Sequence, residues 1–316
     1  MKLLVELPSW LGDCVMLTPA FENLVTYYGN PEITIIGSSV SVEVLKNHPN
    51  VVKNLILNKS YSLFFAHLKS FDEYDVFISF RDSYRTKILK FFISAKNKYQ
   101  FNKNHYLNRH VVEKYNDFVN DALNTFEEPG PLLVYQDNKK IDNSILIAGI
   151  NPGASYGDAK RWGVEKFSEV ALRLSSRYEI IIFGGPDEAD IAFEIEKKLI
   201  QNNVSNFQNL AGKTSVQELI NHISNLSLFI TGDSGPMHLA ASFQIPTVSI
   251  FGPTLHHETS QWKNSRSTIV RKNLSCQPCM KRTCPLNHQN CMNFIKAEEV
   301  LSSIDSLLLS YKECGQ

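Results

Sequence analysis

A turn rich in small and polar residues has the sequence TGDSGPMH and lies between the apolar runs LSLFI and PTVSIFG. The pattern predicts a buried strand, a short helix and a second buried strand. Asp233, Ser234 and Gly235 then lie at the end of the first strand, where amides at the start of a helix bind anions such as phosphate. An ordinary helix cap, with Pro236 early in the helix, is the alternative. These residues alone leave both interpretations open.

A second turn, PSWLGD, follows the predicted strand KLLVEL. Gly12 permits a tight backbone turn, and Asp13 comes directly after it. A carboxylate at a strand end acts as a general base when a substrate hydroxyl lies within hydrogen-bond reach, and a helix cap is again the alternative. The turn has no G-x-G-x-x-G pattern, which argues against a dinucleotide-dependent dehydrogenase.

A third turn, NPGASYGDAKRW, follows the predicted strand SILIAGI. Gly153, Ser155 and Gly157 let the backbone come close to a phosphate, and Lys160 supplies a neutralising charge. The order of residues does not match G-x-x-x-x-G-K-[ST], which excludes a P-loop nucleotide hydrolase. A solvated basic surface turn is the alternative.

Two acidic residues, Asp187 and Glu188, end a glycine turn, FGGPDE, that follows another predicted strand. Carboxylates at such a position bind the ribose hydroxyls of nucleotides. They also favour the start of a helix without any ligand. Both hypotheses remain open on the residues alone.

Basic and aromatic residues are interleaved from 81 to 114, where nine Lys or Arg side chains accompany two acidic ones. A basic surface of this kind binds an anionic acceptor or the acidic face of a membrane. A solvated helix face beside core aromatics is the plain alternative. Arg81, Arg85 and Lys87 follow the predicted strand YDVFISF, so we expect these three to reach a ligand at the sheet edge.

Four of the six cysteines form a C-x2-C-x4-C-x6-C pattern, with His288 among them. They are Cys276, Cys279, Cys284 and Cys291. Four thiolates, or three with the histidine, form a closed structural zinc site, and the first C-x2-C supports one here. The later spacings match no standard zinc ribbon, so free thiols are the alternative.

The composition limits the classes of partner. Lys and Arg total 32, and so do Asp and Glu, so bulk charge gives no reason to coat nucleic acid or an anionic membrane. Any anionic ligand must therefore be met locally. The apolar run at the start is too short for a signal peptide and is interrupted by Glu6 and Asp13, and no later segment has a membrane-spanning length. We expect a cytoplasmic protein.

Apolar strands alternate with helical sequence along the chain, which predicts an α/β protein with two doubly wound, Rossmann-like domains. A helix is expected over 62–71, and the proline- and glycine-containing stretch 125–143 is the predicted linker. We expect a first domain over 1–135 and a second over 144–295. A last helix within 296–316 is expected to return to the first domain. Two such domains would face each other across a cleft at the carboxyl ends of their sheets.

The chain resembles the bacterial lipopolysaccharide heptosyltransferases of glycosyltransferase family 9 in three turns, PSWLGD, NPGASYGDAKRW and TGDSGPMH, which occur in the same order and spacing. The first two are most similar to the heptosyltransferase II branch, and the resemblance covers nearly the whole chain. It implies a GT-B fold, an ADP-L-glycero-D-manno-heptose donor bound by the second domain, and an inner-core acceptor bound by the first. It places the enzyme peripherally at the cytoplasmic face of the inner membrane, with no metal required for catalysis.

The resemblance also implies roles for individual residues in an inverting transfer. Asp13 is the general base that removes the proton from the acceptor hydroxyl. Lys160 and the backbone amides from Ser234 to Pro236 stabilise the charge on the departing diphosphate, while Asp233 accepts hydrogen bonds from the heptose. The other donor-binding residues implied are Ser155, Tyr156, Asp187, Glu188, Gly235 and His238. We expect acceptor contacts from Trp10, Arg81, Arg85 and Lys87.

Two other functions are consistent with parts of the pattern. An enzyme of the same fold could use another nucleotide sugar or another position of the core, because acceptor choice lies in the variable loops of the first domain. A zinc-containing binding protein, in which the two halves carry the cysteine module, belongs to a different class. That hypothesis leaves the three polar turns at strand ends unexplained.

Overall fold

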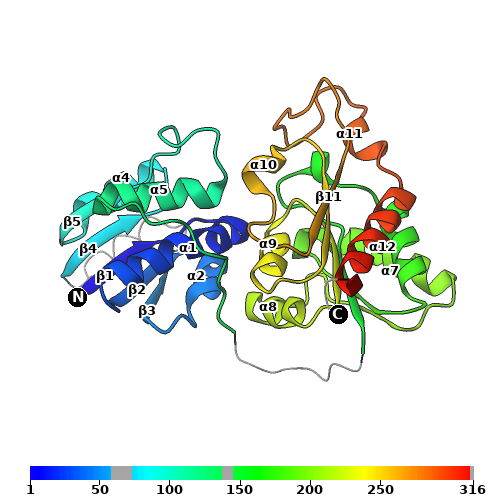
Figure 1. Ribbon diagram of the computed structural model, residues 1–316, viewed down its shortest axis with the longest axis horizontal. Coiled ribbons are helices and arrows are strands. Elements are labelled where there is room, and N and C mark those ends of the chain that lie inside the picture. Colours follow the sequence, from blue (N-terminus) through cyan, green and yellow to red (C-terminus); the bar gives the residue numbers. More distant parts are fainter. Residues whose placement is uncertain (58–72, 137–144, 314–316) are drawn as a thin grey trace. The chain divides into compact units, whose positions relative to one another are not determined.

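Figure 1 shows the computed structural model, which describes residues 1–57, 73–136 and 145–313. The chain divides into two compact units, Met1–Gln136 and Asp137–Gln316. Each unit contains one β-sheet whose neighbouring strands all run parallel. The α/β class expected from the alternation of apolar strands and helices is therefore confirmed.

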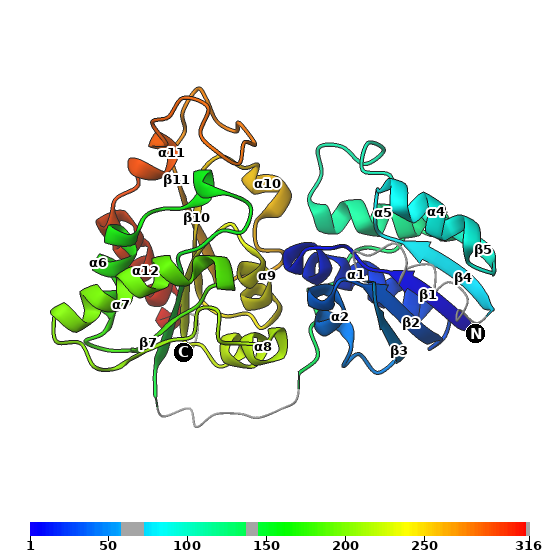
Figure 2. The same cartoon turned by 180° about the vertical axis from the view of Figure 1, so that it is seen from behind.

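The first unit has a five-stranded sheet of order β3-β2-β1-β4-β5 (Figures 1 and 2). Its strands are β1 (Lys2–Glu6), β2 (Glu32–Gly37), β3 (Val51–Ile56), β4 (Tyr74–Ser79) and β5 (Ala95–Gln100). Its helices are α1 (Leu11–Tyr27), α2 (Ser39–Leu45), α4 (Tyr84–Phe92) and α5 (Val111–Leu123). The helix expected over 62–71 lies outside the described residues. The strand order reverses between β1 and β4.

Helices cover both faces of this first sheet. After β1 the chain continues to β2 on one side, and after β4 it continues to β5 on the other. Because crossovers between parallel strands are right-handed, α1 and α4 cover opposite faces of the sheet. On one face α1 contacts α2 and α5. On the other, Leu89 of α4 and Ile93, which directly follows the helix, pack with Leu4 and Phe77. Strands β1, β2 and β4 are thus buried on both sides, as their continuous apolar sequences require.

The second unit has a six-stranded sheet of order β11-β10-β9-β6-β7-β8. Its strands are β6 (Ile147–Asn151), β7 (Glu179–Ile182), β8 (Phe207–Asn209), β9 (Leu228–Gly232), β10 (Thr247–Phe251) and β11 (Ser267–Arg271). Its helices are α6 (Val164–Leu174), α7 (Ala189–Gln201), α8 (Val216–Ser224), α9 (Gly235–Ser242), α10 (His256–Thr259), α11 (Asn290–Asn293) and α12 (Ala297–Glu313), with 3-10 turns η1 (Asp158–Lys160) and η2 (Pro186–Glu188). This is a doubly wound order that reverses between β6 and β9.

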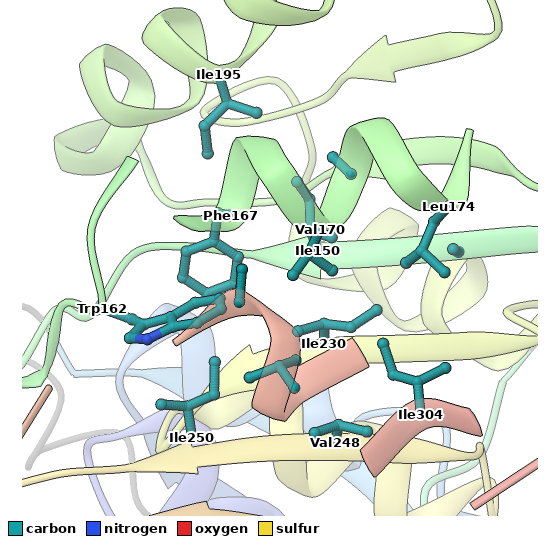
Figure 3. Close-up of a cluster of buried hydrophobic side chains, with 14 of the residues drawn as sticks. Ile150, Trp162, Phe167, Val170, Leu174, Ile195, Ile230, Val248, Ile250 and Ile304 are labelled. Carbon is teal, nitrogen blue, oxygen red and sulfur yellow. The ribbon is translucent and has the colours of Figure 1, made fainter. Parts of the chain in front are cut away.

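One large core covers a face of the second sheet (Figure 3). Trp162 and Phe167 meet edge to face, with ring centroids 5.0 Å apart. The indole nitrogen of Trp162 donates a hydrogen bond to the Ile295 carbonyl at 3.0 Å, so this buried ring satisfies its polar atom. The contact ties the chain just before α6 to the chain just before α12.

The last helix, α12, belongs to the second unit. It contacts α6, β10 and β11, and Val300, Ile304 and Leu307 are buried in the same core. This corrects the expectation that the helix returns to the first domain. Its apolar stripe is instead used against its own sheet. Among the described residues, no helix has the length and apolar character needed to cross a bilayer.

The first part of the predicted linker 125–143 is packed into the first unit. Leu132 and Val134 are buried, and the Leu133 amide donates to Thr18 Oγ1 at 2.9 Å. These contacts tie the segment to α1, so the chain leaves the first unit at residue 136. The proline and glycine content correctly indicated an irregular segment. Its first part is nevertheless packed against the first unit, because Leu132 and Val134 are buried there.

The central strand β6 gives a stability prediction at Gly149. A Cβ added there would lie 2.6 Å from Leu226 Cδ1 and 2.9 Å from Phe183 Cε2. We expect Gly149→Ala to lower the free energy of unfolding by about 1–3 kcal/mol, because the core must shift to admit the methyl group. Gly130→Ala is the control, since a Cβ there meets nothing within 4 Å. Thermal unfolding of both variants tests this, and equal midpoints would contradict it.

Candidate active site

The strand order of the second sheet determines where its ligand site lies. Strands β6 and β9 are neighbours, yet the chain leaves them toward opposite edges of the sheet. Open α/β sheets bind ligands at the carboxyl ends of such a pair. Two of the predicted turns begin there: the loop 152–163 follows β6, and Asp233 follows β9. The structure thus brings together the two turns that the sequence marked as phosphate sites.

Lys160 and Asp233 form a buried ion pair at this point. The Lys160 Nζ lies 2.6 Å from Asp233 Oδ2, and the two side chains are 13% and 6% exposed. Lys160 Nζ also donates to the Asp233 carbonyl at 3.1 Å, and Thr254 Oγ1 donates to Asp233 Oδ2 at 2.6 Å. Burying charges is costly unless they are paired, so these contacts hold a cation at the edge of the sheet.

Ser234 lies at the start of α9, where the sequence left a helix cap and a ligand site both open. It occupies the cap position, but its side chain makes no capping hydrogen bond to the helix. Its Oγ lies 3.0 Å from Thr231 Oγ1 and accepts from Asn151 Nδ2 at 3.3 Å. The hydroxyl is thus turned toward the strands. Ser234 therefore does not act as the ordinary side-chain cap, and the buried Lys160 lies beside the same turn.

The loop 152–163 is supported by the cysteine-rich segment, which the sequence did not predict. The Tyr156 hydroxyl donates to the Met280 carbonyl at 2.8 Å, and Lys160 Nζ lies 4.7 Å from the centre of the Tyr156 ring. Gly157 has φ 152°, and a Cβ there would meet the Arg282 carbonyl oxygen at 2.4 Å. Only glycine permits this close approach of the two backbones. The loop 152–163 and the cysteine-rich segment therefore pack directly against each other.

Zinc binding by the four clustered cysteines stays a prediction, and the charges of Cys276, Cys279 and Cys284 all act on Cys291. Within the described chain, no group of three or more His, Cys, Asp or Glu side chains is arranged to hold a metal ion. Cys284 Sγ instead accepts a hydrogen bond from the Gln289 amide at 3.4 Å, and backbone amides lower the pKa of this thiol. Cys291 is buried beside Gly252, and burial raises its pKa. The segment supports the neighbouring loop through its backbone.

The acidic residues after β7 differ in environment. Asp187 is exposed, whereas Glu188 is buried. Glu188 Oε2 accepts from the Gly185 amide at 2.8 Å. A Cβ on Gly153 would lie 2.1 Å from Glu188 Cδ, so the carboxyl group is packed directly against the loop after β6. Glu188 thus belongs to the same sheet edge. Of the other donor candidates, His238 is buried in α9 and Ser155 is exposed.

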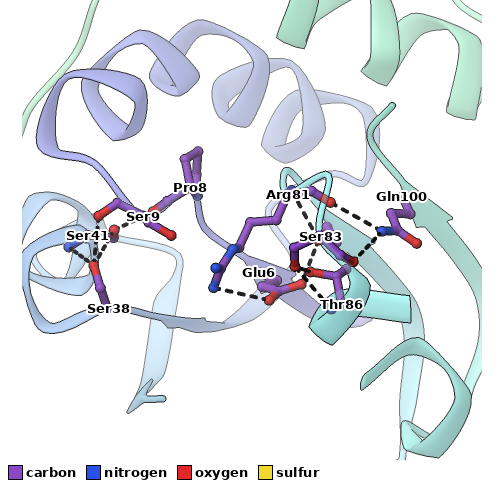
Figure 4. Close-up of polar contacts among 10 residues, drawn as sticks. Glu6, Pro8, Ser9, Ser38, Ser41, Arg81, Ser83, Thr86 and Gln100 are labelled. Carbon is purple, nitrogen blue, oxygen red and sulfur yellow. Dashed lines mark hydrogen bonds and ion pairs between the residues drawn. The ribbon is translucent and has the colours of Figure 1, made fainter. Parts of the chain in front are cut away.

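The first unit presents Asp13 at the corresponding edge of its own sheet. Asp13 lies in the first turn of α1, directly after β1, where a carboxylate interacts favourably with the helix dipole. The start of α2 holds this turn: Ser38 Oγ donates to the Ser9 carbonyl at 3.1 Å, and Ser41 Oγ donates to the Pro8 carbonyl (Figure 4). Trp10, in the same turn, is 54% exposed.

The three predicted basic residues lie after β4, the neighbour of β1. Lys87 is exposed on α4 and Arg85 is half-buried. Arg81 points toward Glu6, with 3.7 Å between Arg81 Nη1 and Glu6 Oε1 (Figure 4). Glu6 is 1% exposed, and no role was predicted for it. The available signal was one acidic residue inside an otherwise apolar strand.

Comparison with known proteins identifies the family. The model for glycosyltransferase family 9 (heptosyltransferase) matches residues 64–290, which is more than half of the chain. The chain belongs to glycosyltransferase family 9. As a glycosyltransferase it must bind an activated sugar, and the paired turns of the second unit are suited to its anionic part.

Relatives of this glycosyltransferase match it over nearly its full length. Lipooligosaccharide heptosyltransferase 2 of Campylobacter jejuni serotype O:2 is 38% identical over 316 residues, covering 98% of each chain. The solved structure of Escherichia coli ADP-heptose LPS heptosyltransferase II superposes with a TM-score of 0.83 at 21% identity, covering 99% of this chain and 100% of that one. E. coli heptosyltransferase WaaC with ADP gives 0.75 at 16% identity, covering 97% and 100%. The expected GT-B fold is confirmed.

The ion pair of this glycosyltransferase gives a prediction at Thr254. We expect Thr254→Val to lower the free energy of unfolding by about 1–3 kcal/mol, because the buried Asp233 carboxylate loses a donor that lies 2.6 Å away. Chemical denaturation measures the change. Thr268→Val on the edge strand β11 is the control for the same substitution. Losses of equal size in the two variants would argue against a buried hydrogen bond at Thr254.

Proposed function

We propose that this glycosyltransferase transfers L-glycero-D-manno-heptose from ADP-heptose to the heptose and Kdo inner core of lipopolysaccharide or lipooligosaccharide, with inversion at the anomeric carbon. The observation that carries the proposal is the 38% identity to the Campylobacter jejuni lipooligosaccharide heptosyltransferase 2 across 98% of both chains. A relative of the same fold, E. coli heptosyltransferase WaaC, has been solved with ADP-2-deoxy-2-fluoro heptose, a ligand of the same class. We propose ADP-heptose as the donor here.

In the proposed reaction, the second unit binds the donor and stabilises the leaving group. Transfer of the sugar leaves negative charge on the diphosphate of ADP. Lys160 and the backbone amides at the start of α9 supply a positive charge and hydrogen-bond donors fixed before the reaction begins, which is the main source of catalysis in such steps. The 2.6 Å contact with Asp233 orients Lys160. Ser155 and Tyr156 complete the loop that would face the diphosphate.

The sugar and the nucleoside need different partners from the diphosphate. Asp233 is already the acceptor for Lys160 and Thr254, and we propose that its carboxylate also accepts from a heptose hydroxyl at the same edge. Glu188 is packed against the loop after β6, and with Asp187 it is proposed to bind the ribose. His238 is proposed to form the wall of this donor site beside them.

The first unit supplies the acceptor and the base in this proposal. Asp13 removes the proton from the acceptor hydroxyl as that oxygen attacks the anomeric carbon on the face opposite ADP, so the configuration inverts. Trp10, Arg81, Arg85 and Lys87 are proposed to bind the acceptor, since Kdo carboxylates and phosphates of the inner core are anionic. Arginine matches such groups through two parallel hydrogen bonds. Membrane association at the site of core assembly is part of the same proposal.

A donor screen tests the proposed function. The purified enzyme is incubated with inner-core acceptor and, in turn, ADP-heptose, ADP-glucose and UDP-sugars, and nucleotide release is measured. We expect acceptor-dependent release of ADP from ADP-heptose only. Comparable turnover with another donor, or none with ADP-heptose, would contradict the proposed substrate.

Asp13 gives the sharpest prediction about the chemical step. We expect Asp13→Asn to lower kcat by about 10²–10⁴-fold, because proton removal by a positioned base contributes that much. ADP affinity, measured by calorimetry, should stay within twofold of wild type. Asp190→Asn is a matched control, since Asp190 is also a first-turn carboxylate, in α7. Near-normal turnover of the Asp13 variant would remove it as the base.

A further inference from the structure

Glu6 is a buried carboxyl group at the sheet edge of the first unit. It is the last residue of β1, and its partner in the neighbouring strand is Ser79, the last residue of β4. Side chains alternate along a strand, so Glu6 shares a face with Leu4, which packs against Leu89 of α4. Glu6 therefore lies beneath α4 and not at the surface, with an exposed fraction of 1%.

A short network joins Glu6 to Arg81. Ser79 Oγ donates to Glu6 Oε2 at 2.6 Å, and the Arg81 amide donates to the same Ser79 Oγ at 3.2 Å. The Arg81 guanidinium approaches the other carboxyl oxygen, with 3.7 Å between Nη1 and Oε1 (Figure 4). Gln100 Nε2 donates to the Arg81 carbonyl at 3.3 Å. Both the backbone and the side chain of Arg81 are thus held.

The charged form of the Glu6 carboxyl group is costly to bury. Burial raises the pKa of Glu6 even though Ser79, Arg81, Thr86 and Arg85 act to lower it. The desolvation of the charge therefore outweighs all its favourable contacts. The rest of β1 from Leu3 onward is buried and apolar, so Glu6 is the one charged side chain in the buried part of this strand. Groups kept at such a cost are commonly functional.

Arg81 is well placed to use this support. Its side chain is 24% exposed, so part of the guanidinium reaches solvent while one edge faces Glu6. A guanidinium has five N–H donors in a planar fork and binds carboxylate or phosphate through two of them. Arg81 follows β4 and Asp13 follows β1, and these strands are neighbours. The fixed cation and the proposed base therefore follow adjacent strands at one sheet edge.

We propose that Glu6 is a positioning residue that orients the Arg81 guanidinium to bind a carboxylate or phosphate of the acceptor. The inference rests on the proposed function, because it assigns the anion to the heptose acceptor. It makes Glu6 important for acceptor binding without contact between Glu6 and the substrate.

The test is a comparison of Glu6→Gln with wild type in steady-state kinetics. Glutamine keeps the size and can accept from Ser79, but it removes the charge that orients Arg81. We expect KM for the acceptor to rise about tenfold, with kcat and KM for ADP-heptose within twofold. Arg81→Ala should raise the same constant, and the double variant should add little to it. The control is Glu32→Gln, the same change at an exposed strand residue.

A stability measurement separates positioning from a structural role. The folded protein holds the Glu6 proton more tightly than the unfolded chain does, so ionisation of Glu6 destabilises the fold as pH rises. Glu6→Gln should therefore melt at or above the wild-type temperature at pH 8, and this gain should shrink toward pH 5. A variant that binds acceptor poorly only because it melts far below wild type would overturn the inference.

Two acceptors identify the anion and separate the possible failures. The kinetics are repeated with an inner-core acceptor whose phosphate has been removed. Persistence of the tenfold effect assigns Arg81 to a carboxylate, and its loss assigns Arg81 to the phosphate.

An unchanged acceptor KM in Glu6→Gln with an active wild type would overturn the positioning role alone. Absence of heptose transfer by wild type would overturn the proposed function and this inference with it.

Discussion

The ion pair between Lys160 and Asp233 holds together the turns that carry the candidate site of the second unit. The two charged atoms lie 2.6 Å apart, and they join the loop after β6 to the turn after β9. Thr254, from the chain after β10, donates to the same carboxylate, so one small contact connects three strand ends. A charge buried this deeply is stable only with such partners. The result is a cation beside the start of α9, a combination that favours anion binding.

Each unit places its charged residues where its strand order reverses. In the second sheet that point lies between β6 and β9, and in the first it lies between β1 and β4. In both places a basic side chain is held by a carboxyl group from a neighbouring strand end: Lys160 by Asp233, and Arg81 by Glu6. A basic side chain held in this way keeps its orientation without substrate, which lowers the entropy cost of binding an anion. The proposed donor and acceptor sites thus follow one physical design.

Continuous apolar runs predicted most strands, because a strand that is buried on both faces needs apolar residues at every position. Strands β5 and β11 were missed, since an edge strand such as AKNKYQ has little apolar surface to bury. The turns with Asp13, Lys160 and Asp233 were found because their small and polar residues directly follow strands. Contacts between residues far apart in the sequence were not predictable, because no local spacing relates them. Examples are the packing of Met280 and Arg282 on the loop after β6 and the contact between Glu6 and Arg81. The spacing of the four clustered cysteines alone could not decide whether they bind a metal, so zinc binding there stays a prediction.

In the proposed function, Lys160, held by Asp233, binds the diphosphate of the donor. Calorimetry of ADP binding to wild type, Lys160→Met and Arg161→Met tests it most directly. Both substitutions remove one positive charge from the same loop, but Arg161 pairs with Asp158 at the surface. The account predicts that Lys160→Met weakens ADP binding by about tenfold or more, equivalent to ~1.4 kcal/mol, while Arg161→Met changes it by less than about twofold. Equal affinities in the two variants would contradict the account.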